Sequence, residues 1–120
     1  MPALPDGRYQ GVALGCYPSP KYRLHRVFFR LLTGEHIECV MFNGREHAVM
    51  LNAGKLRFTG YHEPWLADPD RTVPLHVLNI DLAFDPAYPD RNKLIKVKRT
   101  GELLVCDARM TADRKDYTEF

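Results

Sequence analysis

Two stretches of this chain carry basic side chains that could bind phosphates. Between residues 21 and 30 there are four lysine or arginine residues and no carboxylate, and aromatic rings and a histidine lie among them. Cations follow the phosphates of a single strand, and flat rings stack on its unpaired bases, each stack contributing about 1–3 kcal/mol. This stretch therefore predicts a surface for single-stranded nucleic acid. The residues expected to make contact here are Tyr22, Arg23, Arg26, Phe28 and Arg30.

The second basic stretch spans residues 91–99, where five basic residues occur without an acidic one. Lys96 and Lys98 lie two positions apart, so they share one face of a strand and could hold phosphates. The alternative is an edge strand whose exposed lysines prevent edge-to-edge aggregation. The sequence leaves both interpretations open.

Three more residues are candidates for the same surface. Arg57 and Tyr61 point outward on a predicted strand over residues 55–61 if Leu56 and Phe58 are directed into the core. Trp65, the only tryptophan, follows in an acidic loop. It could close over a bound strand, although a loop tryptophan more often anchors its loop to the rest of the domain.

Residues able to catalyse a reaction are dispersed along the chain. No His-x-His, Cys-x-x-Cys, Gly-rich phosphate loop, nucleophile elbow or zinc-protease motif occurs. His36 and Glu38 share a face and could join His76 or Asp81 around a metal, but alternating polar residues are typical of any half-exposed strand. Three cysteines at wide spacings fit buried free thiols better than a disulfide framework. We therefore expect no enzymatic activity, no metal and no cofactor.

The elements that carry these residues are predicted to be strands. Short apolar segments bounded by glycine, proline and asparagine recur about every ten residues, which is typical of an all-β domain. A short helix over residues 45–52 and a long loop over 62–74 interrupt them. The predicted strands are residues 8–16, 24–32, 36–42, 55–61, 75–84, 93–98 and 102–107.

The clearest predicted hairpin covers residues 24–42 and turns at Gly34. Apolar side chains alternate on both of its strands, and glycine tolerates the backbone conformation that the turn requires. The alternation places Phe29 in the core and directs Phe28 and Arg30 outward.

This hairpin also carries a family resemblance. Residues 25–32 (HRVFFRLL), 36–42 (HIECVMF) and 52–60 (NAGKLRFTG) resemble the OB domain at the start of the exonuclease VII large subunit and of related anticodon-binding and helicase wedge domains. The match covers roughly residues 9–84. It implies a five-stranded OB-type barrel with single-stranded nucleic acid as its ligand. Two features depart from the family: Thr33 stands where these domains commonly carry an acidic residue, and a later hairpin over 93–107 has no counterpart.

The chain is expected to form one domain, because its 120 residues, 45% hydrophobic and 27% charged, suit one globular core. Its expected parts are an OB-like barrel (8–84), a linker (85–92), an additional C-terminal β-hairpin that turns at residues 99–101 (93–107) and a polar tail (108–120). The apolar runs are far shorter than the roughly 20 residues that span a bilayer. The N-terminus lacks the features of a secretory signal. We therefore expect a cytoplasmic protein with no membrane contact.

Together these features predict a non-catalytic protein that binds single-stranded nucleic acid, with DNA as the expected form. Its role would be accessory to replication, transfer or repair, for example on a mobile element. The alternative is a protein-interaction module, such as an accessory subunit, an inhibitor or an immunity protein. It would use the same barrel surface, because interface hot spots also draw on tyrosine, tryptophan and arginine. The sequence leaves homo-oligomer formation open.

Overall fold

Five strands account for most of the described part of this chain, which is residues 3–18, 24–42 and 72–107 of the computed structural model. The strands are β1 (Gly7–Pro18), β2 (Leu24–Leu31), β3 (His36–Phe42), β4 (Thr72–Phe84) and β5 (Asn92–Asp107). No helix occurs among these residues, and so none that is long and apolar enough to cross a membrane. The all-β prediction is confirmed.

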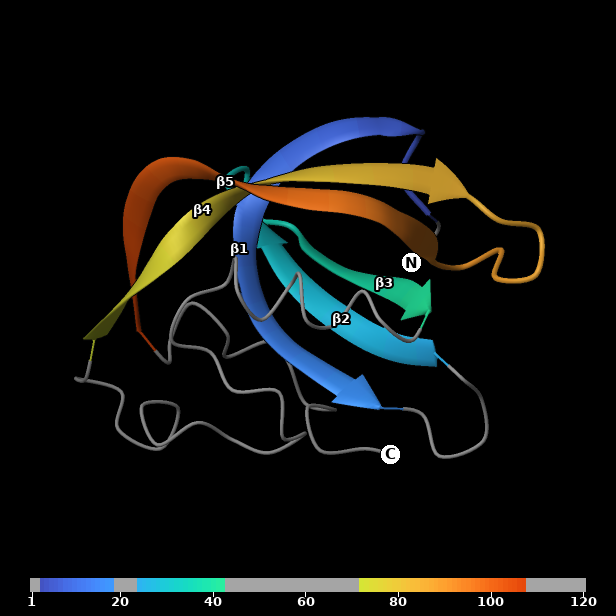
Figure 1. Cartoon of the computed structure of the whole chain (residues 1–120), viewed down its shortest axis with the longest axis horizontal. Coiled ribbons are helices and arrows are strands. Elements are labelled where there is room, and N and C mark those ends of the chain that lie inside the picture. Colours follow the sequence, from blue (N-terminus) through green and yellow to red (C-terminus); the bar gives the residue numbers. More distant parts are fainter. Residues whose placement is uncertain (1–2, 19–23, 43–71, 108–120) are drawn as a thin grey trace.

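The strands close into a barrel in the order β1-β2-β3-β5-β4 (Figure 1). Neighbouring strands are antiparallel except β3 and β5, which run parallel where Cys39 faces Asn92. Strand β1 serves two partners, because residues 7–11 pair with β4 and residues 11–18 pair with β2. The result is a closed five-stranded barrel that is compatible with the expected OB-like fold.

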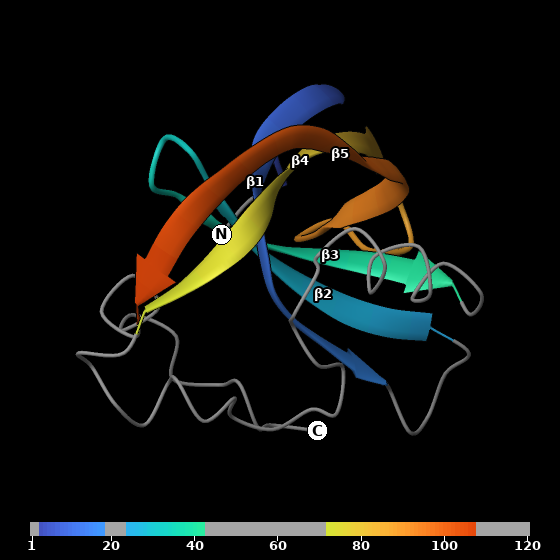
Figure 2. The same cartoon turned by 60° about the vertical axis from the view of Figure 1, so that its left-hand side comes forward.

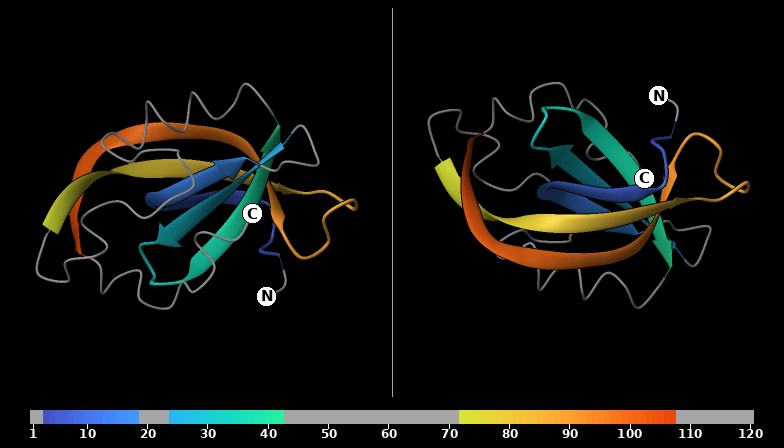
Figure 3. Two further views of the ribbon diagram at one scale, coloured as in Figure 1. Left: turned by 90° about the horizontal axis from the view of Figure 1, so that it is seen from below. Right: turned by 90° about the horizontal axis from the view of Figure 1, so that it is seen from above.

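Strand β5 differs from its prediction. The stretch 93–107, expected as an additional hairpin, is part of one continuous strand that closes the barrel between β3 and β4 (Figure 2). Strands β4 and β5 run side by side as a long curved pair (Figure 3). Residues 85–91 therefore connect β4 to β5 as a hairpin loop rather than linking the barrel to an appended unit.

The hairpin prediction was wrong because of a bend inside β5. Where β4 passes Val77, residues 100–102 of β5 stand against this one residue. The Thr100 hydroxyl donates to the Val77 carbonyl at 2.9 Å, and the Glu102 amide donates to that hydroxyl at 3.2 Å. Gly101 has a φ of 95°, which glycine adopts readily and other residues rarely do. The glycine that indicated a turn serves here as part of a bulge within one strand.

A second irregularity in β5 keeps its inner face apolar. Strict alternation would place Leu94 and Val97 on opposite faces, yet Leu94 is 1% and Val97 is 9% exposed. The register shifts between them, which leaves Ile95 as an extra residue on β5. Both apolar residues therefore point inward, and Lys96 and Lys98 are exposed on the outer face.

Side chains from all five strands fill the barrel interior. Examples that are at most 1% exposed are Ala13, Val27, Phe29, Cys39, Ile80 and Leu94. Cys39 and Cys106 are buried free thiols, as expected from the cysteine spacing. Burial, and then the Glu38 charge, raise the pKa of the Cys39 thiol. This thiol therefore stays protonated and acts as a packing residue.

Asn92 ties the segment before β1 to the start of β5. It is 2% exposed and is the buried polar residue of the described core. Its Nδ2 donates to the Leu4 carbonyl at 2.8 Å, and its Oδ1 accepts from the Leu4 amide at 3.0 Å. Both ends of the amide are thus satisfied, which is the condition for burying it without a large cost.

Some predicted segments fall outside the described residues. They are the helix over 45–52, the strand over 55–61 and the polar tail over 108–120. The barrel of the described residues closes without the 55–61 strand. Most of the loop predicted over 62–74 lies outside as well, but its last three residues, 72–74, belong to β4.

Candidate nucleic-acid interface

A depression of about 520 Å³ lies on the outer face of β1, β4 and β5. Every described side chain that lines it is polar or charged, and we call it the polar depression. Its lining residues are Arg8, Gln10, Asn79, Asp81, Lys96, Lys98, Arg99, Thr100 and Glu102.

The strand register arranges six of these residues as two rows, each crossing three strands. Direct cross-strand partners share a face of the sheet. The first row is Arg8, Asp81 and Lys96, and the second is Gln10, Asn79 and Lys98. The rows are two residues apart along each strand, which separates them by roughly 6.7 Å. Lys96 and Lys98 therefore occupy equivalent places in adjacent rows.

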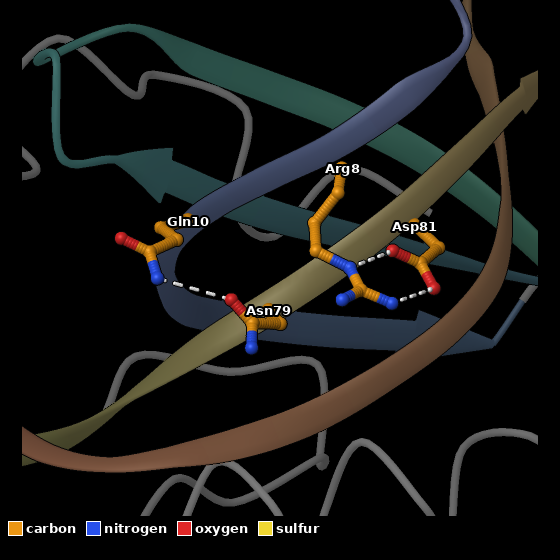
Figure 4. A network of polar contacts seen from close by, with 4 residues as sticks. All are labelled: Arg8, Gln10, Asn79 and Asp81. Atoms are coloured by element: carbon orange, nitrogen blue, oxygen red, sulfur yellow. Dashed lines mark hydrogen bonds and ion pairs between the residues drawn. The ribbon is translucent and has the colours of Figure 1, made fainter.

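Side-chain contacts hold both rows across the seam between β1 and β4 (Figure 4). Arg8 Nε donates to Asp81 Oδ1 at 2.7 Å, and Arg8 Nη2 donates to Asp81 Oδ2 at 3.1 Å. Gln10 Nε2 donates to Asn79 Oδ1 at 3.0 Å. The β1 and β4 residues are thus tied to one another, whereas the two lysines extend from β5.

The depression carries an excess of positive charge. Its basic residues are Arg8, Lys96, Lys98 and Arg99, and its acidic residues are Asp81 and Glu102. The hydrogen bonds from Arg8, and less strongly the Arg8 and Lys96 charges, lower the pKa of Asp81, so this carboxylate is ionised at neutral pH. Burial and then the Arg99 charge lower the pKa of His76, so its imidazole is neutral there. An anionic group such as a phosphate suits this surface.

The structure divides the predicted contact residues between two faces. Lys96 and Lys98 line the polar depression. Arg26, Phe28 and Arg30 lie on the outer face of β2. Tyr22, Arg23, Arg57, Tyr61 and Trp65 lie outside the described residues, and their roles stay predictions.

Phe28 is the predicted contact residue whose exposure the structure contradicts. It points to the opposite face from Phe29, as alternation requires, but it is 0% exposed and belongs to the main buried cluster. The Arg26 guanidinium lies over its ring, 5.4 Å from the ring centroid. Alternation determines the face of the strand to which a side chain points, and it does not determine whether that face is covered. In this structure the Phe28 ring is closed to a base.

The two basic stretches meet at Glu38. Arg26 Nε donates to Glu38 Oε1, and Arg91 Nε lies 3.0 Å from the same oxygen. Arg26 comes from the first stretch and lies on β2. Arg91 comes from the second and ends the loop between β4 and β5. The sequence placed Arg91 in the second basic stretch but not among the expected contact residues, and it considered Glu38 only for a metal site.

The sequence also failed to indicate the β1 and β4 residues of the polar depression. The available signal was local: Arg8 and Gln10 on β1, and Asn79 and Asp81 on β4, are polar pairs at a spacing of two. That spacing marks the outer face of each strand. It does not show that the two pairs meet, because Arg8 and Asp81 are 73 positions apart.

The described strands and loops hold no group of three or more histidine, cysteine or acidic side chains that could bind a metal ion. Of the residues considered for such a site, Glu38 pairs with two arginines and Asp81 pairs with Arg8. The described side chains of the polar depression carry guanidinium, ammonium, carboxylate, amide and hydroxyl groups. Comparisons of the chain with protein-family models, with curated proteins and with solved structures found no match.

Proposed function

We propose that this chain is a non-catalytic cytoplasmic protein that binds single-stranded nucleic acid, with DNA as its ligand, in support of replication, transfer or repair. The observation that carries the proposal is the gathering of four basic residues from two strands, β1 and β5, around the polar depression. OB-type barrels bind oligonucleotides, and the closed five-stranded barrel is compatible with that fold. Kinship with the OB domains of exonuclease VII and of anticodon-binding proteins is part of the proposal, and its support is the hairpin over residues 24–42.

The side chains of the polar depression favour one mode of binding. No aromatic ring is among the described residues that line it, and Phe28, the predicted stacking ring on β2, is buried. The depression therefore offers charge and hydrogen bonds rather than stacking. Binding through phosphates gives little sequence preference and a strong dependence on salt.

The test is fluorescence anisotropy of a labelled single-stranded oligonucleotide at low salt. Lys98→Glu should weaken binding about tenfold, because it reverses a charge on the phosphate path. Arg30→Glu is the matched control, since it makes the same change of charge on β2, outside the depression. No binding of single-stranded DNA or RNA by the wild-type chain would overturn the function. If Arg30→Glu weakened oligonucleotide binding as much as Lys98→Glu or more, the phosphates would have to bind along β2 instead.

A specific observation favours the protein-interaction module as the second candidate. Leu103 and Val105 are 58% and 61% exposed on β5. They share the outer face of the β4–β5 pair, where Pro74 lies opposite Val105 and is exposed too. Exposed apolar patches of this kind often mark protein contacts. A stoichiometric protein partner that co-purifies without nucleic acid, and is lost with Leu103→Ser and Val105→Ser, would support this candidate over the first.

A further inference from the structure

Arg26, Glu38 and Arg91 form a charged cluster outside the polar depression, and we call it the Glu38 cluster. It joins β2, β3 and the loop between β4 and β5. The side chains are 21%, 17% and 40% exposed, respectively, so all three are partly removed from solvent. Two guanidinium groups thus share one carboxylate, and the cluster keeps one excess positive charge.

The sharing is unequal. The oxygen Glu38 Oε1 accepts a hydrogen bond from Arg26 Nε. Arg91 Nε lies 3.0 Å from that oxygen but outside hydrogen-bond geometry, and within the described part of the chain this buried atom has no hydrogen-bond partner. A buried donor without an acceptor is rare in folded proteins and costs free energy. The cluster therefore lacks an acceptor at Arg91.

Arg26 is already oriented for an anion. Its guanidinium lies over the buried ring of Phe28, 5.4 Å from the centroid, which limits its freedom. Guanidinium groups bind phosphates through paired donors in a fixed fork. A phosphate has enough oxygens to accept from both arginines, whereas Glu38 places one oxygen between them.

We propose that Arg26 and Arg91 form a second anion-binding site, specific for phosphate groups, in which Glu38 is an internal competitor. The Glu38 carboxylate occupies the position that a phosphate oxygen would take, and it lowers the affinity of the site. A phosphate binds by displacing Glu38 from the two arginines, and it supplies the acceptor that Arg91 Nε lacks. The inference rests on the proposed function only for the carrier of that phosphate, which would be single-stranded DNA.

The experiment compares Glu38→Gln with Glu35→Gln. Both variants remove one negative charge from the β2–β3 hairpin, but Glu35 is exposed and its carboxylate accepts from Thr33 Oγ1 in the turn. Pyrophosphate is titrated first, and its binding is monitored through the Nε–Hε signals of the arginines in NMR spectra. We expect Glu38→Gln to bind pyrophosphate about tenfold more tightly than the wild type, and Glu35→Gln to change little. Adding Arg26→Gln to Glu38→Gln should abolish the gain.

Labelled single-stranded DNA is then titrated into the same proteins. If Glu38→Gln binds both pyrophosphate and single-stranded DNA more tightly than the wild type, the proposal is supported in full. If only pyrophosphate binds more tightly, the anion site is supported but DNA as the carrier is overturned. Equal affinities of Glu38→Gln and Glu35→Gln for pyrophosphate would overturn the proposal that Glu38 competes with phosphate. This holds even if DNA binding at the polar depression is intact.

A second variant covers the case in which Glu38→Gln fails to fold because two arginines lose their carboxylate. Glu38→Asp keeps the charge but withdraws the carboxylate from the arginines by one methylene group. It should bind pyrophosphate more tightly than the wild type, by less than tenfold. An affinity no higher than that of the wild type would contradict the proposal.

Discussion

Asp81 links the stability of the barrel to pH. Two hydrogen bonds from Arg8, and then the Arg8 and Lys96 charges, lower its pKa below the ordinary value of 3.8. A carboxylate with a depressed folded pKa stabilises the protein above its unfolded pKa, and this contribution is lost as the pH falls through the folded pKa. The stabilisation is therefore complete at neutral pH, begins to fall at about pH 4 and is lost only below the depressed folded pKa.

Asp81→Asn should remove that part of the acid sensitivity. When the pH is lowered from neutral to about pH 2, the melting temperature of the wild type should fall further than that of the variant, as measured by thermal unfolding. The effect is small, because the Arg8 side chain is 62% exposed and water screens the pair. Parallel pH profiles for the two proteins would show that the pair contributes nothing to folding.

Phe28 should act in folding rather than in direct stacking on a base. It is 0% exposed, so Phe28→Ala leaves a cavity and should lower the free energy of unfolding by about 3–5 kcal/mol, measured by urea denaturation. Phe28→Leu keeps most of the apolar volume and should cost much less. With the ring covered, Phe28→Leu should also bind single-stranded DNA like the wild type. A stable Phe28→Leu protein with weakened DNA binding would contradict this and show that the ring contributes to DNA binding.

The elements show which parts of the fold can be predicted from local pattern. The bounds of β2 and β3 were predicted to within one residue, because alternation and the glycine turn at Gly34 are both local. The bounds of strand β5 were not predicted correctly, because Thr100 and Gly101 are residue types that are typical of a hairpin turn. What makes them a bend is the Thr100 hydrogen bond to Val77, which lies 23 positions away. That contact depends on the pairing of β4 with β5.

The two kinds of glycine in these strands should respond differently to alanine. Gly101 has a φ of 95° and open space around it, so Gly101→Ala should cost about 1–2 kcal/mol from backbone conformation alone. A Cβ on Gly11 would lie 2.4 Å from the Arg30 carbonyl oxygen, so Gly11→Ala must push β1 away from β2 and should cost more. Gly101→Asn is a control, because asparagine tolerates positive φ better than alanine. Urea midpoints in any other order would contradict this assignment.

At the scale of the whole molecule, the candidate site was predictable only in part. The lysines of β5 were found because the charge run is local to residues 91–99. Arg8 and Gln10 join them only because β1 and β4 pair at the seam of the closed barrel. The covering of Phe28 is likewise a property of the assembled barrel. Local sequence thus indicated which side chains face outward, and the closure of the barrel determined which of them meet.

The net charge of the chain, +2, allows the local and the global electrostatic effects to be separated. Lys98→Gln and Arg30→Gln lower that charge equally, so a response to the overall field would be the same in both. Each phosphate contact to a single strand releases about 0.7 of a counterion. If the polar depression carries the phosphates, the slope of log Kd against log salt concentration should therefore decrease by about 0.7 for Lys98→Gln. For Lys96→Gln combined with Lys98→Gln it should decrease by about 1.4. Arg30→Gln should leave the slope unchanged. Equal slopes for the lysine and arginine variants, measured by anisotropy over a salt series, would mean that DNA responds to total charge and not to this surface.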